Sequence, residues 1–132
     1  MCTILLVDDN SAMRMAVKAV LDAAPDFTIL AEASNGMEAL QLGNGVRPDV
    51  IVMDVMMPKL GGPEAARKLA AEYGVPIVAL SSHADARLVD AMFDAGVRGY
   101  VLKDHAFDDL RDAVSVVVGG DTFVGEGITS AS

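Results

Sequence analysis

Five short runs of aliphatic and β-branched residues alternate along the chain with longer segments whose apolar residues recur at helical spacing. Several of these runs are continuously apolar, without the alternation of a half-exposed strand, which is typical of strands buried on both faces of a parallel sheet. We therefore expect five parallel strands, each followed by a helix. The runs are Thr3–Val7, Thr28–Ala31, Val50–Met53, Pro76–Leu80 and Tyr100–Leu102.

The segments between the runs carry helix start and stop signals. Asn10 or Ser11 is placed to cap the first helix and Pro25 to end it, and Pro63 stands in the first turn of the third, where a missing N–H is harmless. Strands and helices that alternate through right-handed crossovers make a doubly wound α/β sheet with helices on both faces, the (βα)5 flavodoxin-like arrangement. The helices are expected at Ala12–Ala24, Gly36–Leu42, Pro63–Tyr73, Ala84–Ala95 and Phe107–Val118.

The length of 132 residues suits a single domain with one proper hydrophobic core. Residues 1–120 contain the whole strand and helix alternation. Residues 121–132 have a loop-like composition, so we expect them to form a C-terminal tail or the start of a linker.

The charge balance excludes some partners. The chain has 10 Lys and Arg against 19 Asp and Glu, a formal net charge of −9, and no clustered basic run. Such a surface repels phosphate backbones, so we expect no direct nucleic-acid binding by this segment. With the single Cys2, no signal-peptide pattern and no apolar run near the ~20 residues that span a bilayer, we expect a cytoplasmic protein without a membrane partner.

Polar residues follow four of the five expected strands. Asp8 and Asp9 follow the first, Asp54 the third, Ser81 the fourth and Lys103 the fifth. In open α/β sheets, ligands bind outside the carboxyl ends of the strands, so these side chains should meet at one edge. Three converging carboxylates raise one another's pKa unless a cation lies among them, and hard oxygen ligands favour Mg²⁺.

The blocks around these residues resemble a known family. In the order and at the strand ends where they occur, they are similar to the signature blocks of response-regulator receiver domains, the CheY-like fold of two-component signalling, over residues 3–120. Residues 95–104 further resemble receivers of the NarL/LuxR subfamily, whose full-length members carry a C-terminal helix-turn-helix domain. The four blocks are Val7–Asp9, Met53–Pro58, Ala79–Ser82 and Gly99–Lys103.

The resemblance implies a role for each residue of the cluster. Asp54 would accept a phosphoryl group from the phosphohistidine of a histidine kinase or phosphotransfer protein. Asp9 would be the principal Mg²⁺ ligand, Asp8 would act partly through water, and the backbone carbonyl of Met56 would complete the protein's share. Lys103 would pair with a phosphoryl oxygen. Such a domain catalyses its own slow transfer and hydrolysis but is not a conventional enzyme.

Further residues would switch the domain or set the lifetime of its phosphoryl group. Ser81 would donate its hydroxyl to a phosphoryl oxygen and thereby free space for Tyr100 to turn inward; alternatively, Ser81 and Ser82 only cap the fourth helix and Tyr100 is half-buried with its hydroxyl in water. Met56 and His83 flank the site and would modulate dephosphorylation, the apolar Met56 favouring a lifetime of minutes or longer, although His83 is also explained as an exposed residue at a helix start.

Other functions remain open at this point. An aspartate-nucleophile Mg²⁺-dependent phosphatase of the haloacid-dehalogenase type needs a second aspartate two residues after the first, where this chain has Met56. A flavin module needs a phosphate-cradling loop where this chain has Asp8 and Asp9, and the colour of the protein would test it. A third alternative is a docking module that is never phosphorylated. A phosphorylation-dependent homodimer would use the first and fifth helices or the face of the fourth helix and fifth strand.

Overall fold

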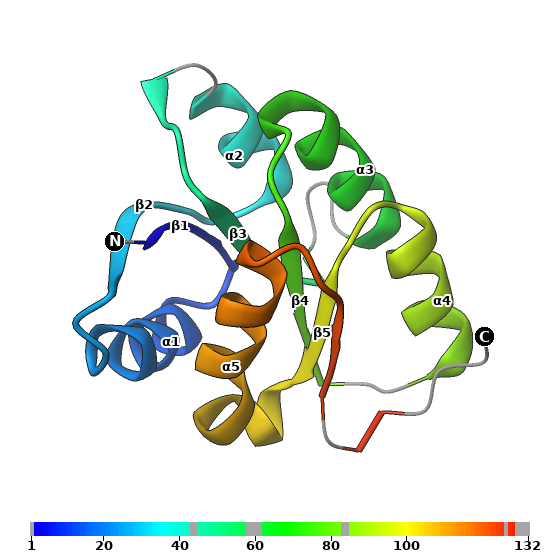
Figure 1. The fold of residues 1–132 in the computed structure, drawn as a ribbon. Coiled ribbons are helices and arrows are strands. Elements are labelled where there is room, and N and C mark those ends of the chain that lie inside the picture. The colour runs from blue at the N-terminus through cyan, green and yellow to red at the C-terminus, as the bar shows by residue number, and fades with distance from the viewer. Residues whose placement is uncertain (1, 43–44, 58–61, 83–84, 126, 129–132) are drawn as a thin grey trace.

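One sheet of parallel strands organises the molecule. The computed structural model describes residues 2–42, 45–57, 62–82, 85–125 and 127–128. Within these ranges six strands pair in the order β2-β1-β3-β4-β5-β6, and every pairing is parallel (Figure 1). The expected doubly wound arrangement is therefore confirmed. The strands are β1 (Cys2–Val7), β2 (Phe27–Ala33), β3 (Val50–Asp54), β4 (Ile77–Ser81), β5 (Gly99–Leu102) and β6 (Phe123–Val124).

Helices cover both faces of the sheet. α1 and α5 pack on one face, and α2, α3 and α4 pack on the other (Figure 1). No helix in the described ranges is both long and apolar enough to cross a membrane. The helices are α1 (Ser11–Asp22), α2 (Gly36–Leu42), α3 (Gly62–Tyr73), α4 (Ala86–Asp94) and α5 (Ala106–Val118), with a short 3-10 helix, η2 (Lys103–His105), before α5.

Side-chain caps begin three of the described helices, and at α2 the Asn35 side chain accepts from the Glu38 N–H at 2.8 Å. The Asn10 side chain accepts a hydrogen bond from the Met13 N–H at 3.0 Å and caps α1, as the sequence indicates. Asp85 caps α4 by accepting from the N–H groups of Arg87, at 2.8 Å, and Leu88. The alternative in which Ser81 and Ser82 serve only to cap this helix is therefore wrong.

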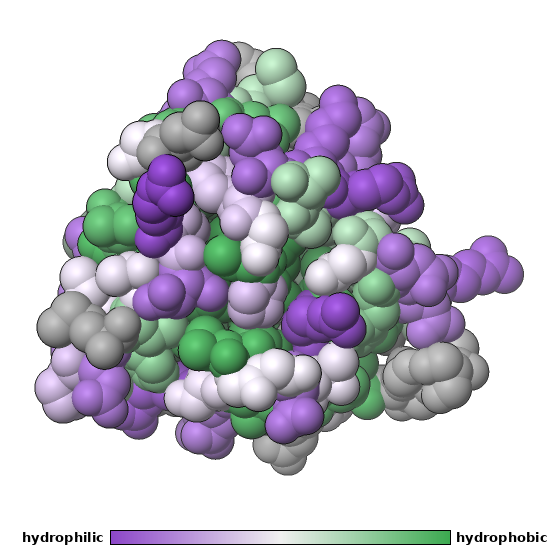
Figure 2. Space-filling model, turned by 45° about the horizontal axis from the view of Figure 1, so that its top comes forward, coloured by the Kyte–Doolittle hydropathy of each residue, from purple (hydrophilic) through white to green (hydrophobic). Residues whose placement is uncertain are grey.

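The core has two halves separated by the sheet. Along β1, Ile4 and Leu6 belong to the half under α1 and α5, whereas Leu5 and Val7 belong to the half under the other three helices. Every residue of β3 and β4 is buried. Burial on both faces is why these strands are continuously apolar in the sequence. On the face that Figure 2 displays, hydrophobic residues form small separate patches between hydrophilic ones.

The C-terminal segment contributes one strand more than expected. Phe123 donates its N–H to the Arg98 carbonyl and Gly125 donates to the Tyr100 carbonyl, both at 2.9 Å, so the segment pairs with the outer edge of β5. Phe123 packs against the core half under α1 and α5, and Ile128 packs against the other half. Two paired residues carry no periodicity from which a strand could be predicted.

Enlarging Gly125 should detach this strand. A Cβ atom at Gly125 would lie 3.1 Å from the Tyr100 carbonyl oxygen and 3.2 Å from Asp109 Oδ2, so the backbone would have to move. We expect Gly125→Val to lower the free energy of unfolding by about 1–3 kcal/mol, the usual cost of overpacking, in urea denaturation. Gly45→Val is the matched control, since nothing lies within 4 Å of a Cβ atom there. Equal effects of the two substitutions would contradict this explanation.

Candidate functional site

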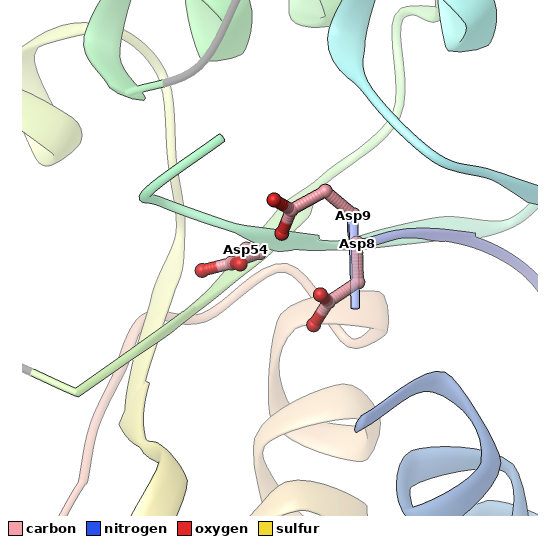
Figure 3. A group of neighbouring side chains, drawn as sticks. All are labelled: Asp8, Asp9 and Asp54. Carbon is pink, nitrogen blue, oxygen red and sulfur yellow. The ribbon is translucent and has the colours of Figure 1, made fainter. Parts of the chain in front are cut away.

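Three carboxylates meet at the carboxyl end of the sheet, next to the place where the strand order reverses between β1 and β3. Asp8 and Asp9 follow β1, and Asp54 is the last residue of β3 (Figure 3). One oxygen from each carboxylate can be chosen so that all three lie within 4.8 Å of one another. The convergence that the sequence predicts is therefore present, at the position where open α/β sheets bind ligands.

Backbone hydrogen bonds orient the two buried carboxylates in the same way. Asp8 Oδ1 accepts from the Asn10 N–H at 2.9 Å, and Asp54 Oδ1 accepts from the Met56 N–H at 3.1 Å. Each bond occupies one carboxylate oxygen in the turn after its strand. The ammonium of Lys103 lies 3.3 Å from Asp54 Oδ2 and 4.0 Å from Asp8 Oδ2, so the second oxygens face the shared space.

The cluster carries more negative charge than its neighbours offset. Asp8 is fully buried and Asp54 is 3% exposed. Loss of water on burial is the largest cause that raises the pKa of Asp8, and the charges of Asp54 and Asp9 raise it further, while the Asn10 N–H and Lys103 oppose the rise. Asp8 Oδ2 accepts no hydrogen bond from the described residues. Three carboxylates, one buried oxygen without a hydrogen bond and, among the described residues, a single ammonium in ion-pair contact fit a hard divalent cation such as Mg²⁺.

Neutralising Asp8 should stabilise the metal-free protein. The folded state binds the Asp8 proton more tightly than the unfolded chain does. This stabilising contribution is complete below the ordinary pKa of 3.8 and is lost as the pH rises through the raised value. The amide of an asparagine at this position can instead donate toward Asp54. We expect Asp8→Asn to raise the free energy of unfolding at neutral pH by about 1–2 kcal/mol, the cost of one unsatisfied buried polar atom.

Urea denaturation of the metal-free protein at neutral and acidic pH measures this effect. The gain should shrink as the pH falls, because Asp8 is then protonated in the parent protein as well. Asp26→Asn, at an exposed turn, is the control for loss of one acidic charge. A gain that is the same at both pH values, or that Asp26→Asn reproduces, would refute the role given to Asp8.

Ser81 and Tyr100 lie next to the cluster, on adjacent strands. Ser81 is the last residue of β4, Tyr100 lies within β5, and both are fully buried. Burial raises the pKa of Tyr100, a hydrogen bond with the Ser81 side chain opposes this, and the charge of Asp85 adds to it. The alternative of a half-buried Tyr100 with its hydroxyl in water is therefore wrong, because the ring already occupies the interior in this conformation.

Two more of the expected residues, Lys103 and Met56, lie beside the cluster. Lys103 begins η2, and its side chain is 21% exposed. Met56 is 58% exposed and lies beside the cluster through its N–H bond to Asp54. His83 lies outside the described residues.

Arg14 is a neighbour of the cluster that the sequence analysis missed. Its Nη1 donates to the backbone carbonyl of Asp8 at 2.5 Å, and its Nε lies 3.4 Å from Glu32 Oε1. The available signal was its spacing, since Arg14 precedes the buried Val17 and Leu21 by three and seven positions and so lies on the sheet-facing side of α1. A charged residue on such a stripe needs a partner near the sheet.

Comparison with known proteins assigns the chain to a family. A family model described as the response regulator receiver domain matches residues 4–115. The transcriptional regulatory protein DegU of Brevibacillus brevis is 37% identical over 96% of this chain and 54% of its own length. The nitrate/nitrite response regulator protein NarL of Escherichia coli is 36% identical over 96% of this chain and 59% of its own length. This chain thus spans a little over half the length of these curated relatives.

Solved structures share the fold. A LuxR-family two-component response regulator from Aurantimonas sp. superposes with a TM-score of 0.87 at 30% identity, covering 93% of this chain and 89% of that one. The response regulator domain of Thermotoga maritima CheB superposes with a TM-score of 0.84 at 24% identity, covering 92% of this chain and 98% of that one, which shows the fold alone.

Proposed function

This chain belongs to the response regulator receiver family of two-component signalling, and from that premise we propose that it accepts a phosphoryl group on Asp54 from a histidine kinase or phosphotransfer protein. The relatives are transcriptional regulators of the NarL/LuxR kind. We propose accordingly that the domain controls transcription through an output part that these residues do not include.

The proposal rests on the groups that surround the Asp54 carboxylate. Its carboxylate is nearly buried at the end of β3, with one oxygen held by the Met56 N–H and the other 3.3 Å from the Lys103 ammonium. In the transfer, an Asp54 oxygen bonds to phosphorus as the phosphorus–nitrogen bond of the donor histidine breaks, and the imidazole keeps the electron pair. Lys103 pairs with a phosphoryl oxygen. Positioning and charge neutralisation carry most of such a reaction.

Asp9, Asp8 and Asp54 would hold Mg²⁺, with the backbone carbonyl of Met56 completing the set. The ion supplies positive charge against the phosphoryl oxygens. The orphaned Asp8 Oδ2 supports this assignment, because a buried acceptor without a hydrogen bond is rare. The phosphatase alternative lacks its general acid and base, because the exposed Met56 thioether cannot transfer a proton.

Ser81 and Tyr100 would form the switch. The Ser81 side chain is hydrogen-bonded to Tyr100 in this conformation. On phosphorylation the Ser81 hydroxyl would donate to a phosphoryl oxygen instead, and the buried Tyr100 would have to find another partner or move. The switch is then an exchange of hydrogen bonds between β4 and β5, with no inward turn of the ring from solvent.

We also propose that phosphorylation promotes a homodimer, and the position of β6 bears on its interface. β6 pairs with the edge of β5 that faces away from β4, and so covers part of the face beside that strand. We therefore propose the α1 and α5 face for a dimer.

Intact-mass analysis after incubation with acetyl phosphate and Mg²⁺ tests the proposed function. Purified chain should gain the mass of one phosphoryl group. A chain that gains none under these conditions, while remaining folded, would overturn the proposal.

A further inference from the structure

We propose that Arg14 is a positioning residue for the cation site: its guanidinium holds the peptide between Asp8 and Asp9 so that the Asp9 carboxylate is presented to Asp54. The inference rests on the proposed function, because it concerns how this chain prepares the same site. Arg14 is not itself a ligand, since a guanidinium carries positive charge and has no acceptor.

The guanidinium joins three segments of the fold. From α1, Arg14 donates to the Asp8 carbonyl after β1 at 2.5 Å and lies 3.4 Å from the Glu32 carboxylate on β2. Its side chain is 22% exposed, which limits its freedom. A planar group with several donors in a fixed geometry can serve both partners at once.

The bonded carbonyl belongs to the peptide that leads into Asp9. The same turn is held by the Asp8 N–H, which donates to the Ala33 carbonyl at 3.0 Å, and by the Asn10 N–H on Asp8 Oδ1. Asp9 is exposed, and within the described part of the chain no hydrogen bond to its side chain is found. No side-chain bond holds the Asp9 carboxylate in place, so the position from which it reaches toward Asp54 is set by its backbone. Arg14 holds the carbonyl of the peptide that leads into that backbone.

Position in the sheet separates Arg14 from Lys103. Glu32 lies on β2 and Lys103 follows β5, so the two cations approach Asp8 from opposite sides along the strand order. Lys103 contacts carboxylate oxygens, whereas Arg14 contacts a backbone carbonyl. Lys103 therefore offsets the negative charge of the carboxylates, whereas Arg14 holds the backbone that carries Asp8 and Asp9.

The sign of the expected effect distinguishes positioning from electrostatics. Removing a positive charge near a cation site should strengthen Mg²⁺ binding if charge alone matters. A positioning role predicts weaker binding. Lys18 is the matched control, because its ammonium lies 3.2 Å from the other Glu32 oxygen and carries the same charge one helical turn along α1.

Calorimetric titration of the unphosphorylated chain with Mg²⁺ measures the affinity. We expect Arg14→Gln to bind about 10-fold more weakly, as is typical when a residue supporting metal ligands is lost. Lys18→Gln should bind equally or slightly more tightly. Arg14→Lys keeps the charge but lacks the planar pair of donors, so it should also bind more weakly, and it remains measurable if Arg14→Gln proves too unstable to titrate.

The rate of phosphoryl acceptance from acetyl phosphate at rising Mg²⁺ supplies a second readout. Arg14→Gln or Arg14→Lys should need more Mg²⁺ to reach half of the maximal rate, while the rate at saturation returns to that of the parent. Parental or tighter Mg²⁺ affinity in the Arg14 variants, or a rate that stays low at saturation, would overturn the inference and leave the proposed function standing. A parent protein that binds no Mg²⁺ would instead overturn the proposed function.

Discussion

Asp54→Asn is expected to abolish the gain of a phosphoryl group from acetyl phosphate and Mg²⁺, the largest effect of any single substitution in this chain. An amide oxygen is a far weaker nucleophile than a carboxylate. Asp8 is held by a similar backbone bond, but the Lys103 ammonium lies farther from it, at 4.0 Å against 3.3 Å from Asp54. Asn keeps a side-chain oxygen that can accept the Met56 N–H, which Asp54 accepts at 3.1 Å, so the turn after β3 should survive. Intact-mass analysis measures the result directly.

Two comparisons make this result specific. Asp26→Asn removes an equal charge at an exposed turn and should be phosphorylated like the parent. Circular dichroism should show that Asp54→Asn is folded. An Asp54→Asn chain that gains as much mass as the parent would mean that another residue accepts the phosphoryl group, and the assignment of Asp54 would be wrong.

Removal of Mg²⁺ is expected to have the second-largest effect. With excess EDTA, acceptance should stop, because three carboxylates and one ammonium leave the cluster too negative to receive a phosphoryl group. Mg²⁺ should also stabilise the fold: a ligand at 100 times its dissociation constant adds about 2.7 kcal/mol to the free energy of unfolding. A thermal unfolding series in rising Mg²⁺ measures this gain.

Asp9→Asn identifies the site of the ion in the same series. Asp9 is the exposed member of the cluster, so replacing it should disturb the core little while it removes a ligand. We expect the Mg²⁺-dependent rise in unfolding temperature to shift to much higher Mg²⁺ concentrations. Stabilisation identical to that of the parent, or continued phosphoryl acceptance in EDTA, would show that the ion does not act at this cluster.

Much of the fold was predictable because its signals are local. Continuous apolar runs such as Val50–Met53 occur where helices cover both faces of a strand, and all residues of β3 are in fact buried. Caps such as Asn10 act within one helical turn of the residues they satisfy. Boundaries shifted by one or two residues, so that Asp54 and Ser81 end their strands and do not follow them.

β6 shows where such prediction fails. Phe123 and Val124 form a strand only because the edge of β5 offers free carbonyl and N–H groups to them. Their own sequence, next to glycines, predicts a loop. An edge pairing of two residues depends on a partner more than twenty positions away, which no local pattern contains.

The sequence by itself determined which functional groups lie together at one edge of the sheet. Parallel strands place their carboxyl ends together, so Asp8, Asp9, Asp54 and Lys103 had to converge once five strands were recognised. Only the tertiary structure decided how these groups are supported. The burial of Tyr100 beside Ser81 and the bond from Arg14 to the Asp8 carbonyl depend on the packing of separate segments to within an ångström. Packing at that precision follows from the shapes of all neighbouring side chains, and residue type and spacing do not specify it.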